Sequence, residues 1–166
     1  MTARPRLECA RLTLVPQTLD AGRALLAGED PGFALAEGYP HADTFDALRM
    51  FVEHGGPDDG GWFVVRSDDA AGCRVIGDLG TFGPPDDQGR VEIGYGLAAP
   101  SRGRGYGTEA VGTFVDWLVT LPGVRLVVAR VEVGNEASRR LLARIGFTLT
   151  GEAEGHWTLE RPAPAP

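Results

Sequence analysis

The chain has few cysteines, no long apolar run and no signal-peptide core. Its 166 residues include only two cysteines, Cys9 and Cys73, which lie far apart and lack metal-ligand spacing. We interpret both as reduced thiols. No apolar run is long enough to span a bilayer, and no signal-peptide core follows the N-terminus. These absences predict a cytoplasmic protein with no membrane partner.

Positive charge is also scarce. The chain carries 16 Lys and Arg against 23 Asp and Glu, which gives a formal net charge of −7. Because nucleic-acid binding depends on many cations that neutralise phosphates, this balance argues against a nucleic-acid partner. It favours cationic substrates instead. No metal cluster, nucleophile triad or paired-carboxylate pattern is present, so we expect no metal.

The apolar pattern changes repeatedly between strand and helix. Strand-like runs cover 11–15, 62–66, 75–82, 91–97, 126–133 and the flanks of 151–155, and helix-like runs cover 18–26, 44–52, 108–121 and 135–146. Thr18 and Thr44 are expected to cap the first two helices. We predict a single-domain α/β (α+β) fold over residues 1–161, with a mixed six- to seven-stranded sheet and about four flanking helices. Residues 162–166 are predicted to be a disordered tail.

The most informative segment is the glycine-rich loop 101–108, between the strand-like run at 91–97 and a helix. Its sequence is Ser-Arg-Gly-Arg-Gly-Tyr-Gly-Thr, with glycines at alternate positions. Glycines bring backbone N–H groups close to a ligand, and a helix start adds unpaired donors and partial positive charge. The loop therefore predicts a phosphate-binding site.

Three other interpretations of this loop are weaker. A P-loop requires Gly-Lys-Ser/Thr, which is absent. Gly105–Ala110 satisfies the dinucleotide pattern G-x-G-x-x-A, and Glu132 follows near the end of the next strand. However, seven residues separate Leu97 from Gly105, whereas that fingerprint turns almost directly from strand to helix. An RNA-binding RGG-like segment is at odds with an acidic, ordered domain. A dinucleotide-binding protein stays a remote alternative.

The strand before the loop has an unusual face. Alternation places Glu92, Gly94 and Gly96 on one side. Two positions without side chains leave a shallow trough with a carboxylate at its end, and glycines within a strand often mark close approach by a ligand. The alternative is a solvent-facing Glu92 beside two turn-forming glycines.

The ordered motifs resemble the GNAT superfamily of N-acetyltransferases. Arg102-x-x-Gly105-x-Gly107 is similar to the pyrophosphate loop of that family, and the run Asn135-Glu-Ala-Ser138 followed by Gly146-Phe147 is similar to a second motif. The start Ala10–Leu14 and the run Glu92–Tyr95 look like the RimJ/RimL branch. The resemblance covers residues 7–159.

The resemblance implies acetyl-CoA as co-substrate and a splay between the strands at 91–97 and 126–133. Pantetheine would pair with the main chain of the first strand. The implied cofactor-binding residues lie in or beside the two motifs: Leu97, Ala98, Arg102, Gly103, Arg104, Gly105, Tyr106, Gly107, Thr108, Asn135 and Ser138.

Acetyl transfer to an amine needs a neutral nucleophile and a donor to the developing oxyanion. Glu92 is the candidate for proton removal, through water, and a main-chain N–H near Leu97 or Ala98 is the candidate oxyanion donor. Many GNAT enzymes carry a tyrosine acid seven residues after the motif asparagine, where this chain has Leu142. Protonation of the leaving thiolate would then fall to Ser138 or to a water, or the protein would have no dedicated acid.

The acceptor is less defined than the donor. We expect a peptide N-terminus or an amine-bearing small molecule, with His41 and His156 as candidate substrate contacts. A CoA-binding regulatory module without catalysis is the alternative from another class. Homodimers are common in this branch, although the sequence does not determine the oligomeric state.

Overall fold

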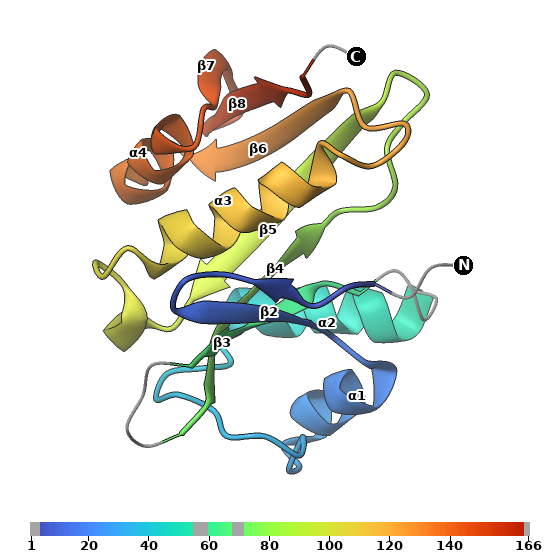
Figure 1. The fold of residues 1–166 in the computed structure, drawn as a ribbon, viewed down its shortest axis with the longest axis vertical. Coiled ribbons are helices and arrows are strands. Elements are labelled where there is room, and N and C mark those ends of the chain that lie inside the picture. The colour runs from blue at the N-terminus through green and yellow to red at the C-terminus, as the bar shows by residue number, and fades with distance from the viewer. Residues whose placement is uncertain (1–3, 55–59, 68–71, 165–166) are drawn as a thin grey trace. The chain divides into compact units, whose positions relative to one another are not determined.

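The computed structural model describes residues 4–54, 60–67 and 72–164. Eight strands form a mixed sheet in the order β1-β2-β3-β4-β5-β6-β8-β7, and four α-helices accompany them (Figure 1). The predicted fold class is therefore confirmed. The chain divides into two compact units, Met1–Gly80 with Tyr95–Ala110, and Thr81–Gly94 with Val111–Pro166.

The first unit contains antiparallel strands that pair in sequence order. β1 (Leu7–Glu8) pairs with β2 (Leu12–Pro16), β2 with β3 (Trp62–Arg66), and β3 with β4 (Arg74–Thr81). The two-residue β1 was not predicted, because it is too short to show an apolar alternation. The pairing gives this unit a continuous antiparallel surface on which helices pack.

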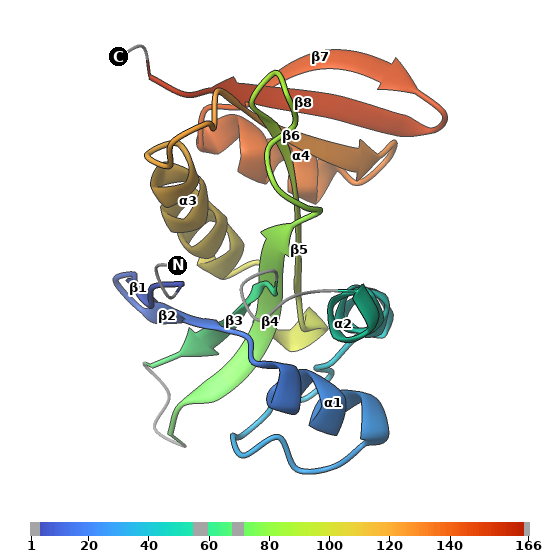
Figure 2. The ribbon, with the colours of Figure 1, turned by 90° about the vertical axis from the view of Figure 1, so that its right-hand side faces the viewer.

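Helices α1 (Leu19–Ala27) and α2 (Ala42–His54) pack against each other (Figure 2). A Cβ added to Gly22 of α1 would lie 3.1 Å from Val52 of α2, so the two helices approach closely. One cluster of buried side chains in this unit includes residues of β3 and β4: Ala21, Leu25, Tyr39, Leu48, Phe63, Val75 and Ala98.

The two predicted threonine caps have different outcomes. Thr18 caps α1, because its hydroxyl accepts a hydrogen bond from the Ala21 N–H at 3.2 Å. Helix α2 begins at Ala42, two residues before Thr44, so Thr44 lies within its first turn. The Thr44 hydroxyl is instead directed to Asp78, which changes its role from a local cap to a tertiary contact.

The second unit contains the parallel strand pair. Residues Arg90–Ile93 of β5 (Arg90–Leu97) lie parallel to Leu126–Ala129 of β6 (Leu126–Glu132). This register covers only part of each strand, since β5 continues to Leu97 and β6 to Glu132.

The C-terminal strands complete the pairing in this unit. β6 pairs antiparallel with β8 (His156–Pro162), and β8 pairs with β7 (Thr148–Ala153). Pro162, placed by the sequence in a disordered tail, ends β8, and the Ala163 N–H donates to the Arg125 carbonyl at 2.9 Å. Residues 165 and 166 of that predicted tail lie outside the described residues.

Two helices bury apolar side chains in the second unit. Phe114, Val115 and Leu118 are buried on α3 (Tyr106–Leu118), and Leu142 is buried on α4 (Glu136–Arg144). The helix α3 begins two residues earlier than predicted, so Tyr106 and Gly107 already belong to its first turn.

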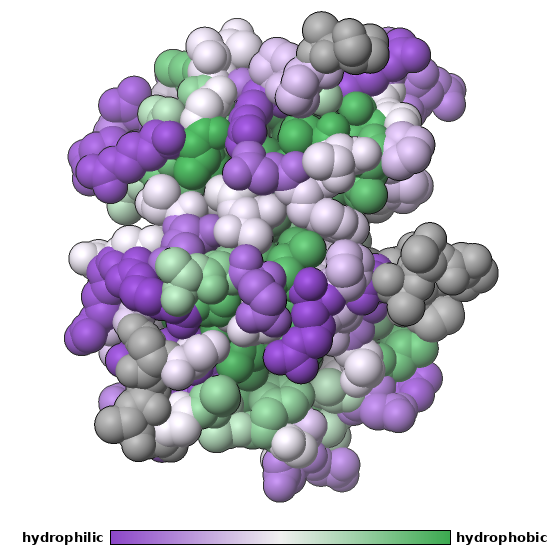
Figure 3. Space-filling view, in the orientation of Figure 1, coloured by the Kyte–Doolittle hydropathy of each residue, from purple (hydrophilic) through white to green (hydrophobic). Residues whose placement is uncertain are grey.

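Charged and apolar residues are interspersed on the molecular surface that Figure 3 shows. In the part of the chain that the structure describes, no helix is long and apolar enough to cross a membrane.

A glycine in the middle of β4 allows a close backbone approach within the first unit. A Cβ at Gly77 would collide with the Gly96 carbonyl and with Leu97. We expect Gly77→Ala to lower the free energy of unfolding by about 2 kcal/mol or more, because backbone must move. Gly151→Ala is the control, since nothing lies within 4 Å of that added Cβ. Urea unfolding measures both, and equal effects would contradict the close-approach argument.

Candidate functional site

The glycine loop leaves β5 and turns into α3 through left-handed backbone. After a 3₁₀ turn at Ala99–Ser101, Gly103 has φ of 73° and Gly105 has φ of 81°. Nothing lies within 4 Å of a Cβ added to Gly103, so this glycine is needed for its backbone angle rather than for space. Left-handed glycines that lead into a helix N-terminus direct N–H groups outward. The loop therefore fits an anionic phosphate group.

The arginines of this loop have partners within the first unit. The Arg102 Nε donates to the Leu97 carbonyl at 2.9 Å, so its side chain folds back on the end of β5. The Arg104 carbonyl accepts from Arg11 Nη1 at 3.1 Å. Arg102 thus shapes the loop as well as adding positive charge to it, and phosphate contact by either arginine stays a prediction.

Arg11 holds the loop and the start of α3 against β2. Its backbone N–H donates to one oxygen of Glu109 at 2.6 Å, and its Nε donates to the other at 2.8 Å. The guanidinium lies 4.6 Å from the centroid of the buried Tyr106 ring, and Arg66 lies 5.5 Å from the same ring. Sequence reasoning missed this clamp, because no local pattern links Arg11 to a helix almost one hundred residues later.

At the end of β5, the backbone N–H groups of Leu97 and Ala98 point to opposite edges of the strand. The Ala98 N–H donates to the Ile76 carbonyl of β4 at 2.8 Å. It is therefore already paired, and the expectation that Ala98 supplies an oxyanion donor is wrong. Successive residues of a strand direct their N–H groups to opposite edges. The Leu97 N–H consequently faces the edge away from β4, which leaves Leu97 as the candidate donor.

The predicted trough on β5 is covered by aromatic rings. A Cβ at Gly94 would lie 2.8 Å from the Phe82 ring, and a Cβ at Gly96 would collide with the His41 ring at Cε1 and Nε2. The Phe82 and His41 rings therefore occupy the predicted shallow trough, in the space that the missing side chains of the two glycines leave. Glu92 is half-buried on this strand, and its carbonyl accepts from the Phe82 N–H at 2.9 Å.

A buried polar network supports His41. The Asp78 Oδ2 accepts hydrogen bonds from the Thr44 hydroxyl at 2.6 Å and from the Tyr39 hydroxyl at 2.9 Å. The Thr44 hydroxyl oxygen also lies 3.2 Å from His41 Nδ1 and 3.4 Å from His41 Nε2, and the Thr44 backbone N–H donates to Nδ1 at 3.3 Å. Sequence reasoning named His41 alone. A lone aspartate within the apolar run 75–82 was the signal that could have revealed the network.

Burial controls the protonation of two groups in this network. Desolvation raises the pKa of Asp78, and hydrogen bonds from Thr44 and Tyr39 and the charge of His41 oppose that rise, while Asp43 adds to it. Desolvation, and then the charge of Asp78, raises the pKa of the Tyr39 phenol well above its usual range. Tyr39 is therefore a permanent donor to Asp78.

The remaining predicted residues lie in the second unit. Asn135 caps α4, and its Oδ1 accepts from the Ser138 N–H at 3.1 Å. Leu142, at the position of the family tyrosine, is fully buried. His156 begins β8 opposite Glu132, and its Nδ1 lies 3.0 Å from the Glu154 carbonyl. The structure thus brings Asn135 and Ser138 together through an ordinary helix cap.

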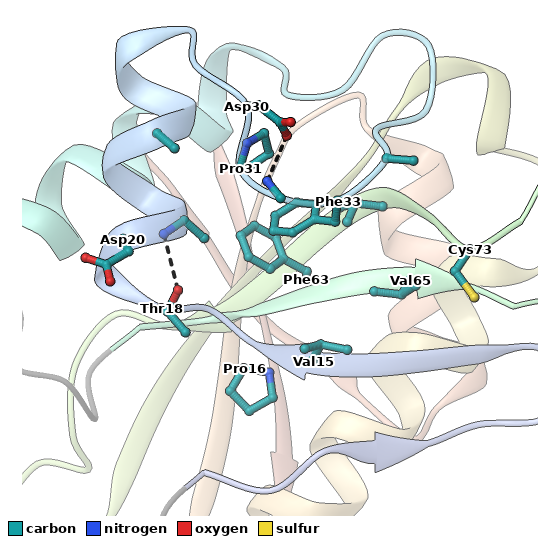
Figure 4. A pocket seen from close by; sticks show the side chains of 15 residues that line it. Val15, Pro16, Thr18, Asp20, Asp30, Pro31, Phe33, Phe63, Val65 and Cys73 are labelled. Carbon is teal, nitrogen blue, oxygen red and sulfur yellow. Dashed lines mark hydrogen bonds between the residues drawn. The ribbon is translucent and has the colours of Figure 1, made fainter.

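An apolar pocket of about 670 Å³ lies in the first unit (Figure 4). Its wall includes Phe63 and Val65 of β3, Val75 of β4, and Phe33, whose ring centroid lies 4.9 Å from that of Phe63. The described residues that line it include none of the predicted site residues. The pocket is therefore separate from the glycine loop and from the His41 network.

Comparison with known proteins agrees with the motifs. A family model described as an acetyltransferase (GNAT) domain matches residues 11–148. The uncharacterized N-acetyltransferase YjdG of Bacillus subtilis (strain 168) is 30% identical over 165 residues, which cover 91% of this chain and 95% of that protein.

Solved structures share the fold. The ribosomal-protein-S5-alanine acetyltransferase from Vibrio fischeri is similar with a TM-score of 0.67 and 19% identity, over 96% of this chain and 97% of that one. The microcin C7 self-immunity acetyltransferase MccE, solved with acetyl-CoA and AMP, is similar with a TM-score of 0.65 and 16% identity, over 92% and 93%. GNAT enzymes use acetyl-CoA, and their substrates are amines.

The Arg11 clamp should contribute to stability. We expect Arg11→Ala to lower the free energy of unfolding by about 1–3 kcal/mol, because the half-buried Glu109 carboxylate loses its charge-assisted hydrogen bond from Arg11 Nε, and the Arg104 carbonyl and the Tyr106 ring lose their contacts with the guanidinium. Arg23→Ala is the control, since Arg23 forms an exposed pair with Asp20 at 3.6 Å. Chemical unfolding measures both variants. An Arg11 effect no larger than that of Arg23 would contradict the clamp.

The buried Asp78 should make stability depend on pH. Its folded pKa lies above its ordinary value of 3.8, so the folded state holds the proton more tightly. The free energy of unfolding therefore falls as pH rises from the ordinary pKa of Asp78 through its folded-state pKa. The total loss is about 1.4 kcal/mol for each pH unit between the unfolded-state and folded-state pKa values.

The variant Asp78→Asn removes this titration, so wild type should lose stability relative to the variant as pH rises through the same window. Urea unfolding at a series of pH values measures the difference. Asp46→Asn, at an exposed position of α2, is the control. Parallel curves for wild type and Asp78→Asn would rule out the raised pKa.

Proposed function

This chain belongs to the GNAT acetyltransferases, in the RimJ/RimL-like family, and we propose that it transfers an acetyl group from acetyl-CoA directly to a primary amine. The observation that carries the proposal is the loop with left-handed Gly103 and Gly105, which leads from the end of β5 into the first turn of α3. An acetyl-enzyme intermediate is not part of the proposal.

The loop would hold the pyrophosphate of acetyl-CoA. The Arg102 N–H already donates to the Ala99 carbonyl at 3.2 Å, so the proposed donors are the backbone N–H groups over Gly103–Thr108. Together with the helix N-terminus they favour a doubly negative group, and the two loop arginines add charge. The Arg11 clamp keeps this backbone in place by binding Glu109 and the Arg104 carbonyl. The family resemblance adds Asn135 and Ser138 to the proposed cofactor contacts.

The free edge at the end of β5 would pair with pantetheine. Leu97 directs its N–H to the edge opposite β4, where an extended amide chain can add as a further strand. The same N–H would stabilise the oxyanion that develops on the acetyl group. Bound acetyl-CoA supplies an activated thioester, and the protein residues hold and orient it.

The amine must lose its proton before it attacks. At pH 7, neutralising a lysine side chain costs about 4.6 kcal/mol, against about 1.2 kcal/mol for an N-terminal amine. Glu92 is the proposed acceptor of this first proton, through water. The excess of acidic residues would attract a cationic substrate electrostatically. Either a peptide N-terminus or a small amine fits this chemistry.

Two measurements test the proposed function. Calorimetry should show that acetyl-CoA binds, and release of free CoA thiol should follow with at least one of three amines: a peptide that begins with alanine, an N-acetylated peptide containing lysine, or spermidine. Binding without turnover would instead support a regulatory CoA-binding module. Stabilisation by NADH but not by acetyl-CoA would overturn the donor assignment.

Two variants make the test specific to residues. Gly103→Ala should weaken acetyl-CoA binding by about tenfold or more, because alanine disfavours this left-handed backbone. Gly123→Ala is the matched control, with φ of 89° and nothing within 4 Å of the added Cβ. Glu92→Gln should lower kcat by about 100-fold or more, whereas Glu8→Gln should have no effect. Equal binding by the two glycine variants would contradict the loop assignment.

A further inference from the structure

The apolar pocket of the first unit has no part in the proposed acetyl transfer. It is lined by residues of α1, β2, β3 and β4 and by the loop that follows α1, and its volume is about 670 Å³ (Figure 4). Protein interiors rarely leave spaces much larger than a water molecule unfilled. Pockets that hold small organic molecules have volumes of about 300–1,000 Å³. This pocket is therefore large enough for an organic ligand.

The inner surface of the pocket is apolar. Phe63 of β3 and Val75 of β4 are almost entirely buried there, and the half-buried Phe33 ring lies 4.9 Å from the Phe63 ring, centroid to centroid. The polar side chains of the described lining are those of Thr18, Asp20, Asp30 and Cys73. Because an apolar cavity with few polar partners holds water poorly, an apolar group gains free energy by entering it.

The loop after α1 forms one wall, and backbone hydrogen bonds hold it at both ends. The Glu29 N–H donates to the Ala24 carbonyl of α1 at 2.8 Å. Further along the loop, the Val75 N–H of β4 donates to the Ala34 carbonyl, and the Ala36 N–H donates to the Val75 carbonyl, both at 2.9 Å. The pocket is therefore preformed, and a ligand need not order this wall.

The exposed part of the lining is negatively charged. Asp20 lies in the first turn of α1 and Asp30 in the loop after it, and both are exposed (Figure 4). The Gly32 N–H donates to Asp30 Oδ1 at 2.8 Å, which fixes this carboxylate beside the pocket. Arg23 forms an exposed pair with Asp20 at 3.6 Å, a type of contact that contributes little. None of the described lining residues is Lys, Arg or His.

We propose that this pocket is a binding site for an organic cation, whose apolar body enters between the Phe33 and Phe63 rings and the helix α1, and whose positive group lies beside Asp20 and Asp30. The apolar body supplies most of the affinity because it leaves water. The carboxylates select the sign of the charge. The partial positive charge of the α1 N-terminus is offset by Asp20 in its first turn. This site goes beyond the proposed acetyl transfer and is separate from its residues.

Three probes of one ring system test the charge selection, in the absence of acetyl-CoA. They are (2-naphthylmethyl)trimethylammonium, 2-naphthylmethanol and 2-naphthylacetate. The quaternary nitrogen has no N–H, so the cation cannot be an acetyl acceptor and its charge is independent of pH. Calorimetry should give a Kd of about 1 mM or tighter for the cation, a weaker Kd for the alcohol and the weakest for the anion. An anion that binds as tightly as the cation would overturn the proposal.

Methyl NMR tests where the cation binds. Val15, Val65 and Val75 line the pocket, whereas Val119 and Val133 lie in the second unit. The cation should shift the methyl signals of the first three valines, assigned by single Val→Ile variants, and should leave those of the other two in place. No shift of the pocket methyls at millimolar concentration of the cation would overturn the proposal, as would larger shifts at the two control valines.

A larger side chain in the pocket should compete with the ligand. Ala24 is half-buried on α1 and lines the pocket, and Ala24→Leu adds apolar volume at little cost in helix propensity. This variant should weaken binding of the cation by about tenfold or more, because the added side chain takes up space that the ligand needs. Ala143→Leu, at an exposed position of α4, is the control. Wild-type affinity in folded Ala24→Leu would contradict the assigned site.

A pair of double variants tests the carboxylates without a change in pocket volume. Asp20→Asn with Asp30→Asn should weaken the cation by about fivefold and leave the alcohol unchanged, and asparagine can still accept from the Gly32 N–H. Asp86→Asn with Asp87→Asn is the control with the same change in net charge. Asp86 is exposed, and its Oδ1 accepts from the Gln88 N–H at 2.9 Å. Equal weakening by the two double variants would show an effect of net charge alone and would contradict the role of Asp20 and Asp30.

Discussion

The close approach of β4 to the end of β5 is the constraint on which the first unit depends. Gly77 has no side chain where the Gly96 carbonyl and Leu97 pass, and Ala98 completes the contact by donating to Ile76. Because Ala98 is paired in this way, Leu97 faces the other edge of the strand. One backbone contact thus sets both the start of the glycine loop and the direction of the proposed oxyanion donor.

The same strand segment connects the glycine loop with the polar network. Gly96 admits the His41 ring, and Asp78, the residue after Gly77, accepts the hydroxyl groups behind that ring. Burying a carboxylate is costly unless it is hydrogen-bonded, and two hydroxyl donors reduce this cost without removing the raised pKa.

Charge has two separate roles in this molecule. The excess of acidic residues acts at long range and is screened by salt, so it would favour encounter with the proposed amine substrate in its cationic form. Arg11 acts at short range, where its paired hydrogen bonds to Glu109 and its contact with the Tyr106 ring orient the first turn of α3. A loop that presents backbone N–H groups needs such support, because each misplaced donor weakens anion binding.

The sequence by itself determined the family, the order of strands and helices, and the glycine loop, because these depend on local apolar periodicity and on backbone angles that glycine permits. It also placed Asn135 as a helix cap. Tertiary structure alone decided that Ala98 is paired, that rings cover Gly94 and Gly96, and that Arg11 meets Glu109. These contacts join residues distant along the chain, so no local pattern specifies them, and only packing of the strands brings their atoms within hydrogen-bond distance.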